Sequence, residues 1–154
     1  MFALIQGNLT RQFRALELLE TLLEEEFELL RVRDTSAITT LEFSIHELLR
    51  QIAVERVDLK TTMQGTALLE YAGMLPDEEG TEVRRLFHLI DSLEQRCARY
   101  ASRNTELSLA LLDQSQALLV HLHEQITPRT SLVYGAGGRI LVERPDAALY
   151  SGRF

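Results

Sequence analysis

The sequence predicts an all-α protein: an elongated antiparallel bundle of three to four long amphipathic helices, followed by a tail that is non-helical or forms a short β-hairpin. Apolar residues recur at spacings of three and four over most of the 154 positions, which is the period of a helix that buries one face. Trp is absent and Pro occurs only three times, so few positions forbid a helix. With 45% hydrophobic and 25% charged residues, the chain can build a core. We therefore divide it into a helical bundle, residues 1–127, and a C-terminal tail, residues 128–154, that binds a partner or packs on the bundle.

The first helix is expected over about residues 8–33, with Asn8 as its N-terminal cap. Its apolar residues step by three and four and therefore form one stripe, which consists of Leu9, Phe13, Leu16, Leu19, Leu23, Phe27 and Leu30.

A second helix is expected to follow the capping side chains of Asp34, Thr35 and Ser36. Its stripe is a heptad interrupted by the charged Glu55, and it consists of Ile38, Leu41, Ile45, Leu48, Ile52 and Leu59. This pattern is typical of nearly aligned helices that pack knobs into holes, as in a coiled coil or a helical bundle. Residues 73–80 are expected to form the next connection, because Pro76 favours a turn and the acidic residues after it favour a helix start.

Two further helical patterns cover about residues 81–101 and 104–126. The first of them again steps by three and four, through Val83, Leu86, Ile90, Leu93, Cys97 and Tyr100. Between the two patterns, residues 102–104 are compatible with a kink or with uninterrupted helix. The second pattern has a wider apolar face than one partner helix requires, so it is either extra core or a face left for a ligand helix. Its apolar residues are Leu107, Leu109, Leu111, Leu112, Leu118, Leu119, Leu122 and Ile126.

The tail after Pro128 changes character. Residues 131–134 and 139–143 are apolar and favour strands, and Gly135, Gly137 and Gly138 between them favour a turn or a hinge. An apolar tail of this kind is not typical of a disordered terminus, so it should be buried on its own bundle or against a partner.

Charge and composition exclude several classes of function. The net charge is −7, and residues 1–126 hold 12 basic and 21 acidic residues, which argues against nucleic-acid binding. Cys97 is the single cysteine, so no intramolecular disulfide forms, and we expect it to be a small buried side chain. No apolar run approaches the ~18 residues that span a bilayer, and the first residues lack the positive segment of a secretory signal, so we expect a cytoplasmic protein without membrane insertion.

No catalytic, cofactor or metal site is expected. His121 and His123 are two residues apart and point to different faces of a helix, and Glu42 with His46 has no second matching pair. The glycines of residues 135–138 lack the strand, helix and Lys-Ser/Thr of a phosphate-binding loop. We therefore predict a protein that is not an enzyme.

The order of these elements, with their residues, resembles the FlgN family of flagellar export chaperones. The most specific part of the likeness is Tyr134-Gly135-Ala136-Gly137-Gly138-Arg139, which is similar to the family's Tyr-Gly-x-x-Gly segment. The other parts are the Leu- and Glu-rich opening helix over residues 16–30 with its break at Asp34, the Leu48-Leu49 helix ending near Glu55-Arg56, and Asn104-Thr105-Glu106-Leu107 opening a leucine-rich helix.

The resemblance implies a bacterial chaperone for type III export, which binds the C-terminal helical segments of flagellar hook-associated proteins, prevents their premature polymerisation and delivers them to the export apparatus. It implies that binding lies in the C-terminal part, and the residues we assign are Leu111, Leu112, Leu118, Leu119, Leu122, Leu132, Val133, Tyr134, Ile140 and Leu141. The sequence departs from the family in its strand-like tail after Gly138, where an amphipathic helix would be expected. The alternative is a structural or regulatory helical protein whose heptads mediate self-association, and a homodimer is compatible with both functions.

Overall fold

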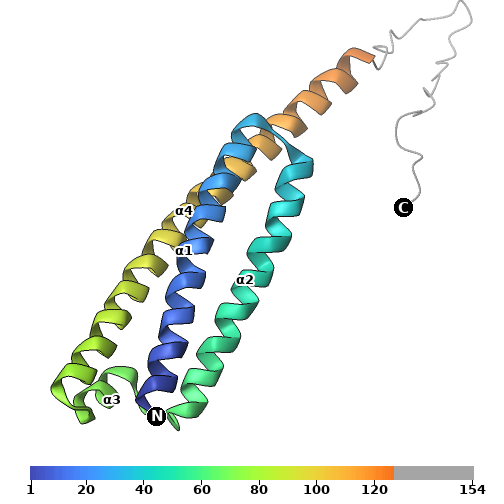
Figure 1. Cartoon of the computed structure of the whole chain (residues 1–154). Helices are drawn as coiled ribbons and strands as arrows, with labels where there is room; N and C mark the ends of the chain where they lie inside the picture. Colours follow the sequence, from blue (N-terminus) through green and yellow to red (C-terminus); the bar gives the residue numbers. More distant parts are fainter. Residues whose placement is uncertain (127–154) are drawn as a thin grey trace, which may run out of the picture. The chain divides into compact units, whose positions relative to one another are not determined.

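The computed structural model describes residues 1–126, which form four helices (Figure 1). These are α1 (Phe2–Val32), α2 (Thr35–Thr62), α3 (Leu68–Met74) and α4 (Asp77–Ile126). The all-α prediction is confirmed for this part of the chain, which contains no strand; the predicted β-hairpin lies outside the described residues. The chain divides into two compact units, Met1–Leu109 and Ala110–Phe154.

In the unit of residues 1–109, α1 packs between α2 and the first part of α4 as a three-helix bundle. The helices α1 and α4 run parallel, because Leu16 with Cys97 and Leu23 with Asn104 are both 81 positions apart along the chain. The helix α2 runs antiparallel to both, and the short α3 lies at the end where the N-terminus is found (Figure 1). Consecutive long helices are therefore antiparallel, as predicted.

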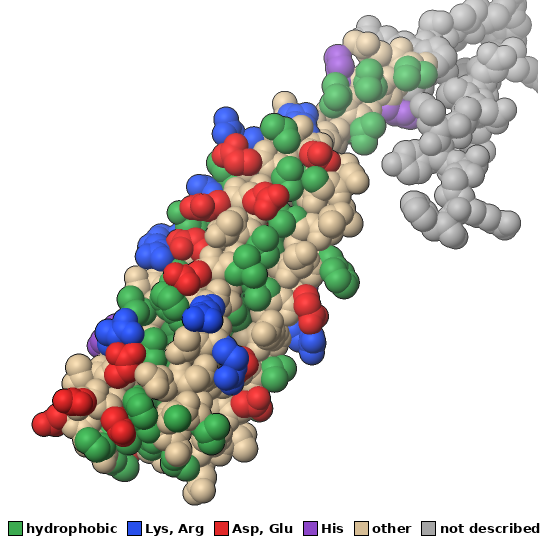
Figure 2. Space-filling view, in the orientation of Figure 1, with side chains coloured by type: hydrophobic (Ala, Val, Ile, Leu, Met, Phe, Trp, Pro, Cys, Tyr) green, Lys and Arg blue, Asp and Glu red, His purple; other side chains and the backbone are tan. Residues whose placement is uncertain are grey.

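Most of the core comes from the predicted stripes, to which Ile5, Met63 and Ala72 are added. The buried apolar residues are Ile5, Leu9, Leu16, Leu19 and Leu23 of α1, Leu41, Ile45, Leu48 and Ile52 of α2, and Val83, Leu86, Ile90, Leu93 and Cys97 of α4, together with Met63 and Ala72. Because the sets of α2 and α4 step by three and four, the heptads predicted for the second and third helical patterns are the core-facing positions. Charged side chains of both signs are scattered over the surface (Figure 2).

The start of the first helix was predicted wrongly. The helix α1 begins at Phe2 rather than near Asn8, and Asn8 is buried inside it instead of capping it. The physical reason is that Ile5 extends the stripe by one more step of four ahead of Leu9, and both side chains are buried. The prediction at the next junction is confirmed, since the Asp34 carboxylate accepts a hydrogen bond of 3.0 Å from the Ala37 backbone N–H and caps α2.

The structure corrects one other predicted boundary and decides between the alternatives left open at a second. Residues 73–80 are mostly helical, because α3 occupies part of them and α4 starts at Asp77, directly after Pro76. The three acidic residues expected to favour a helix start do occupy the first turn of α4. Residues 102–104 are helical, so the third and fourth predicted patterns form one 50-residue helix.

The interruption of the α2 heptad by Glu55 is explained by a polar network with α1. The Arg11 guanidinium donates two hydrogen bonds to the Glu55 carboxylate, from Nε at 2.6 Å and from Nη2 at 2.8 Å. The Asn8 amide donates to the same carboxylate at 2.7 Å and to the Glu55 carbonyl at 2.8 Å, and the Gln12 amide donates to Asn8 Oδ1 at 2.6 Å. Buried polar groups of this kind are stable only when they are paired, so the network favours one register of α1 on α2.

The network makes part of the stability pH-dependent. The hydrogen bonds from Arg11 hold the pKa of the Glu55 carboxyl below its ordinary range. Because the pKa of Glu55 is lower in the folded state, its charged carboxylate stabilises the fold at pH values above the unfolded-state pKa of about 4.3. This stabilisation is lost as the pH falls through the folded-state pKa. We expect the free energy of unfolding of Glu55→Gln to fall less than that of the wild type on acidification below about pH 4.3. Urea unfolding at a series of pH values measures this, and Glu25→Gln, which removes an exposed carboxylate of α1, should follow the wild-type curve. If Glu55→Gln also follows it, the network does not contribute.

A glycine sets the contact between α3 and α4. A Cβ at Gly80 would overlap the backbone carbonyl of Ala72, whereas a Cβ at Gly73 has no atom within 4 Å. We expect Gly80→Ala to lower the free energy of unfolding by about 1–3 kcal/mol, because two backbones must separate. Gly73→Ala, in the last turn of α3, should raise it by about 0.4–1 kcal/mol, because it restricts the unfolded chain. Urea unfolding of both variants measures the difference, and equal effects would mean that α3 does not pack closely on α4.

Candidate functional site

The predicted partner-binding leucines of the last helical pattern lie on an exposed helix. Within residues 110–126 of α4, exposed fractions are 52% for Leu112, 58% for Leu118, 61% for Leu119 and 43% for Leu122, while Leu111 is partly buried. We call these five residues the terminal leucine face. Figure 2 shows hydrophobic side chains on this helical stretch.

The spacing of the terminal leucine face gives it the shape of an apolar helix side. Leu111, Leu118 and Leu122 are four or seven residues apart and share one side of the helix, and Leu112 and Leu119 flank them. The sequence left two alternatives for this wide face, and among the described residues all of these side chains except the partly buried Leu111 are exposed. A contiguous exposed apolar face of this kind usually marks an interaction site.

The other predicted site residues belong to the tail. Leu132, Val133, Tyr134, Ile140 and Leu141, and the predicted turn glycines Gly135, Gly137 and Gly138, lie outside the described residues. Their roles stay predictions.

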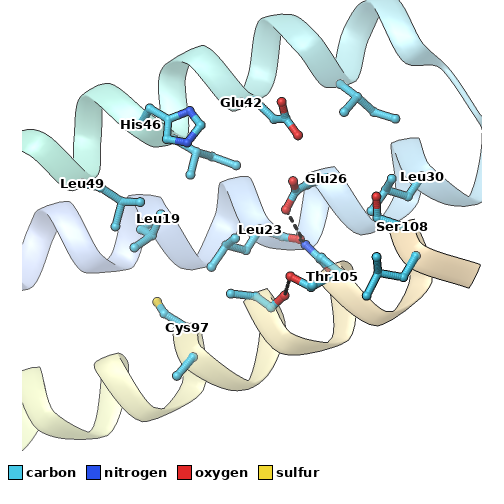
Figure 3. A pocket seen from close by; sticks show the side chains of 16 residues that line it. Leu19, Leu23, Glu26, Leu30, Glu42, His46, Leu49, Cys97, Thr105 and Ser108 are labelled. Atoms are coloured by element: carbon cyan, nitrogen blue, oxygen red, sulfur yellow. Dashed lines mark hydrogen bonds between the residues drawn. The ribbon is translucent and has the colours of Figure 1, made fainter. Parts of the chain in front are cut away.

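The structure contains a second candidate surface that the sequence did not reveal, a groove between α2 and α4 in the unit of residues 1–109. Its floor is α1, and its walls carry Ile38, Ile45 and Leu49 from α2 and Ala98, Ala101 and Leu109 from α4 (Figure 3). The wider part has a volume of about 480 Å³. A second part of about 310 Å³ shares Leu19, Leu49 and Cys97 with it and extends it toward Leu16 and Ile52. We call the two parts together the α2–α4 groove.

Short side chains help to explain the width of the groove. Ala98 and Ala101 of α4 and Ala53 of α2 line it, so the walls carry methyl groups where longer side chains would close the gap. Near its narrower end, Arg56 of α2 and Glu94 of α4 form an ion pair that joins the walls. These alanines were the only signal in the sequence, and they could be interpreted only once the three helices were placed.

Polar groups occupy the wider part of the groove. The Asn104 side chain donates hydrogen bonds from Nδ2 to the Leu23 carbonyl and to Glu26 Oε2, both at 2.7 Å. The carboxylates of Glu26 and Glu42 point toward each other from α1 and α2, and His46 lies one turn further along α2 (Figure 3). Neither carboxylate forms an ion pair within the part of the chain that the structure describes.

Cys97 in the groove has the properties of a packing residue. Its thiol lies 3.6 Å from the Leu16 carbonyl, to which it donates, and the side chain is buried as predicted. Burial raises the pKa of the Cys97 thiol, which disfavours the reactive thiolate.

Among residues 1–126, no three His, Cys, Asp or Glu side chains are grouped to hold a metal ion. The groove is therefore mainly apolar, with the carboxylates of Glu26 and Glu42 in its wider part.

None of the helices in residues 1–126 has the length and the hydrophobicity needed to cross a membrane.

In comparison with known proteins, a family model described as "FlgN protein" matches residues 1–141. No curated protein and no solved structure matches the chain.

Proposed function

The chain belongs to the FlgN family of flagellar export chaperones, and on this premise we propose that it binds the C-terminal helical segments of flagellar hook-associated proteins in the bacterial cytoplasm. In this function it prevents their premature polymerisation and delivers them to the type III export apparatus. The family consists of chaperones rather than enzymes.

The exposed terminal leucine face is the observation that supports this proposal. An amphipathic helix of the substrate can lay its apolar side along Leu111, Leu118 and Leu122, with Leu112 and Leu119 beside them. Such a substrate segment exposes its own apolar side before assembly, and burial against the chaperone would keep it from other copies. Each leucine that becomes fully buried contributes about 1.5–3 kcal/mol, so a few contacts suffice for stable binding.

The tail completes the binding surface in this proposal. Leu132, Val133, Tyr134, Ile140 and Leu141 supply further apolar contacts, and Gly135, Gly137 and Gly138 let the chain turn so that both parts can meet one segment. A substrate segment that folds only on binding pays an ordering cost, which lowers its affinity. A lower affinity suits a chaperone that must release its substrate at the export apparatus.

The test is complex formation between the purified full-length chain and full-length hook-associated proteins, followed by size-exclusion chromatography with light scattering. We expect a complex with at least one of them, and no complex when its C-terminal helical segment is deleted. We also expect the chain to suppress polymerisation of that protein. Self-association of the chain, with no binding to any hook-associated protein, would contradict the proposal and favour a structural helical protein.

A further inference from the structure

The α2–α4 groove is a second binding surface, distinct from the terminal leucine face. From its shape and charge we infer that it receives an amphipathic helix of a partner protein, with apolar residues facing α1 and Lys or Arg residues facing Glu26 and Glu42. This inference does not depend on the proposed chaperone function, because it concerns other residues and another kind of ligand helix.

The dimensions of the groove fit a helix. Its wider part runs along α1 from Leu19 to Leu30, which at about 1.5 Å per residue corresponds to ~17 Å, or about three helical turns. A three-helix bundle with an open side offers the place that a fourth helix takes in a four-helix bundle. The wider part, with about 480 Å³, has room for several apolar side chains, since a cavity of about 150 Å³ already holds one benzene.

The charge at the rim selects a basic helix. Within residues 1–126, the half-buried Glu26 carboxylate has one hydrogen-bond partner, Asn104, and no cation, although α1 and α4 form ion pairs elsewhere, such as Glu20 with Arg96. Glu42, on the α2 wall of the groove, points toward it (Figure 3). Two carboxylates that face each other without a cation repel one another, and a Lys or Arg between them would remove this repulsion.

A buried polar atom in the same place supports a ligand. Asn104 is 3% exposed and lines the groove, and its Oδ1 has no hydrogen-bond donor among residues 1–126. Its Nδ2 is already engaged with two acceptors, so turning the amide over would leave these two without their donor. Natively buried acceptors are almost always paired. A donor carried by a basic helix would satisfy this atom after a small shift of the side chains around it.

The same charge argument disfavours a second copy of this chain as the occupant. The exposed apolar helix that it could offer, residues 110–126, contains Asp113 and Glu124 and neither Lys nor Arg. Its insertion would bring further negative charge to a rim that is already acidic. A partner with basic residues is therefore the occupant that the groove favours.

The experiment uses two fluorescent helical peptides with the same leucine stripe. One carries Lys at the positions flanking the stripe and the other carries Glu. We expect the full-length chain to bind the Lys peptide, by fluorescence anisotropy, and to bind the Glu peptide at least about 10-fold more weakly. Glu26→Gln with Glu42→Gln should weaken binding of the Lys peptide by about 10-fold. The matched control, Glu25→Gln with Asp58→Asn, changes the net charge equally at exposed positions of α1 and α2 and should change affinity less than about 2-fold.

A substitution that fills the groove tests the same inference independently of charge. Ala98→Trp places an indole at an exposed position that lines the groove and should abolish peptide binding, while Ser102→Trp, one turn further along α4 and outside the lining, should not. Leu118→Asp with Leu122→Asp should leave binding of the Lys peptide unchanged. If it weakens that binding, the peptide binds the terminal leucine face and the inference is wrong. Equal affinity for both peptides, or a homodimer that Ala98→Trp dissociates, would also overturn it.

Discussion

Replacing Leu118 and Leu122 together by Asp is expected to weaken binding of the hook-associated protein by about 100-fold or more. Both side chains are exposed in the free chain and would be buried against the substrate helix. Losing two leucine contacts removes about 3–6 kcal/mol of binding free energy, and desolvating two carboxylates adds to this loss. The free chain should be nearly unaffected, because exposed substitutions usually change stability by less than about 0.5 kcal/mol. Isothermal titration calorimetry and thermal unfolding measure the two effects on the same preparation.

The matched control is Gln116→Asp with Val120→Asp. It adds the same two charges at the same spacing of four, on the side of the helix away from Leu118 and Leu122, and both positions are exposed. We expect this variant to bind within about 3-fold of the wild type, since its positions lie outside the proposed contact. If both variants bind equally weakly, added charge or weakened helix is the cause. If the leucine variant unfolds instead, these leucines belong to a core.

The periodicity of the sequence was sufficient to predict the core of the bundle. Leu41, Ile45, Leu48 and Ile52 are buried in α2 as their heptad indicates, because a stripe with steps of three and four has only one face to bury. The charged Glu55 in that heptad could be seen but not explained. Its partners Arg11 and Asn8 lie 44 and 47 positions away in sequence, and no local pattern connects them.

The surfaces were predictable to different degrees. The width of the apolar pattern over residues 104–126 indicated a face beyond the needs of the bundle, and the structure exposes most of its leucines. The α2–α4 groove depends on the relative positions of three helices and on Ala53, Ala98 and Ala101 at its edges. Small residues in a helix usually carry no such information, because alanine is also the most favourable residue for a helix. Tertiary contacts therefore had to be known before the groove could be recognised.

The misplaced start of α1 illustrates how a local signal competes with a tertiary one. Asn8 is a preferred capping residue, and Gly7 before it weakens a helix, so the local sequence favours a helix start there. The structure instead continues the helix to Phe2 and uses the Asn8 amide to pair with Glu55. Burial of Ile5 and the pairing of Asn8 outweigh the local preference.

This correction leads to the largest stability effect that we expect. Ile5 is 0% exposed and Leu4, its neighbour in sequence, is 71% exposed. Ile5→Ala should lower the free energy of unfolding by about 2–5 kcal/mol, because it removes buried methyl groups and leaves a cavity. Leu4→Ala should change it by less than about 0.5 kcal/mol. Urea unfolding, monitored by far-ultraviolet circular dichroism, measures both effects. The slope of the unfolding free energy against urea concentration should be equal for the two variants, which checks that they unfold in the same way.

The two substitutions distinguish the possible starts of the helix because they remove similar apolar side chains from adjacent positions. If the helix began at Asn8, Ile5 and Leu4 would both lie in a terminal segment ahead of the bundle, and both variants would be nearly neutral. A large effect of Ile5→Ala alone requires a regular helix that turns one side chain inward and its neighbour outward. The polar network strengthens this expectation, since Ile5 and Asn8 are three positions apart and share the buried face of α1. Loss of Ile5 should therefore also loosen the pairing of Asn8 with Glu55, and Glu55→Gln should cost less stability in the Ile5→Ala background than in the wild type.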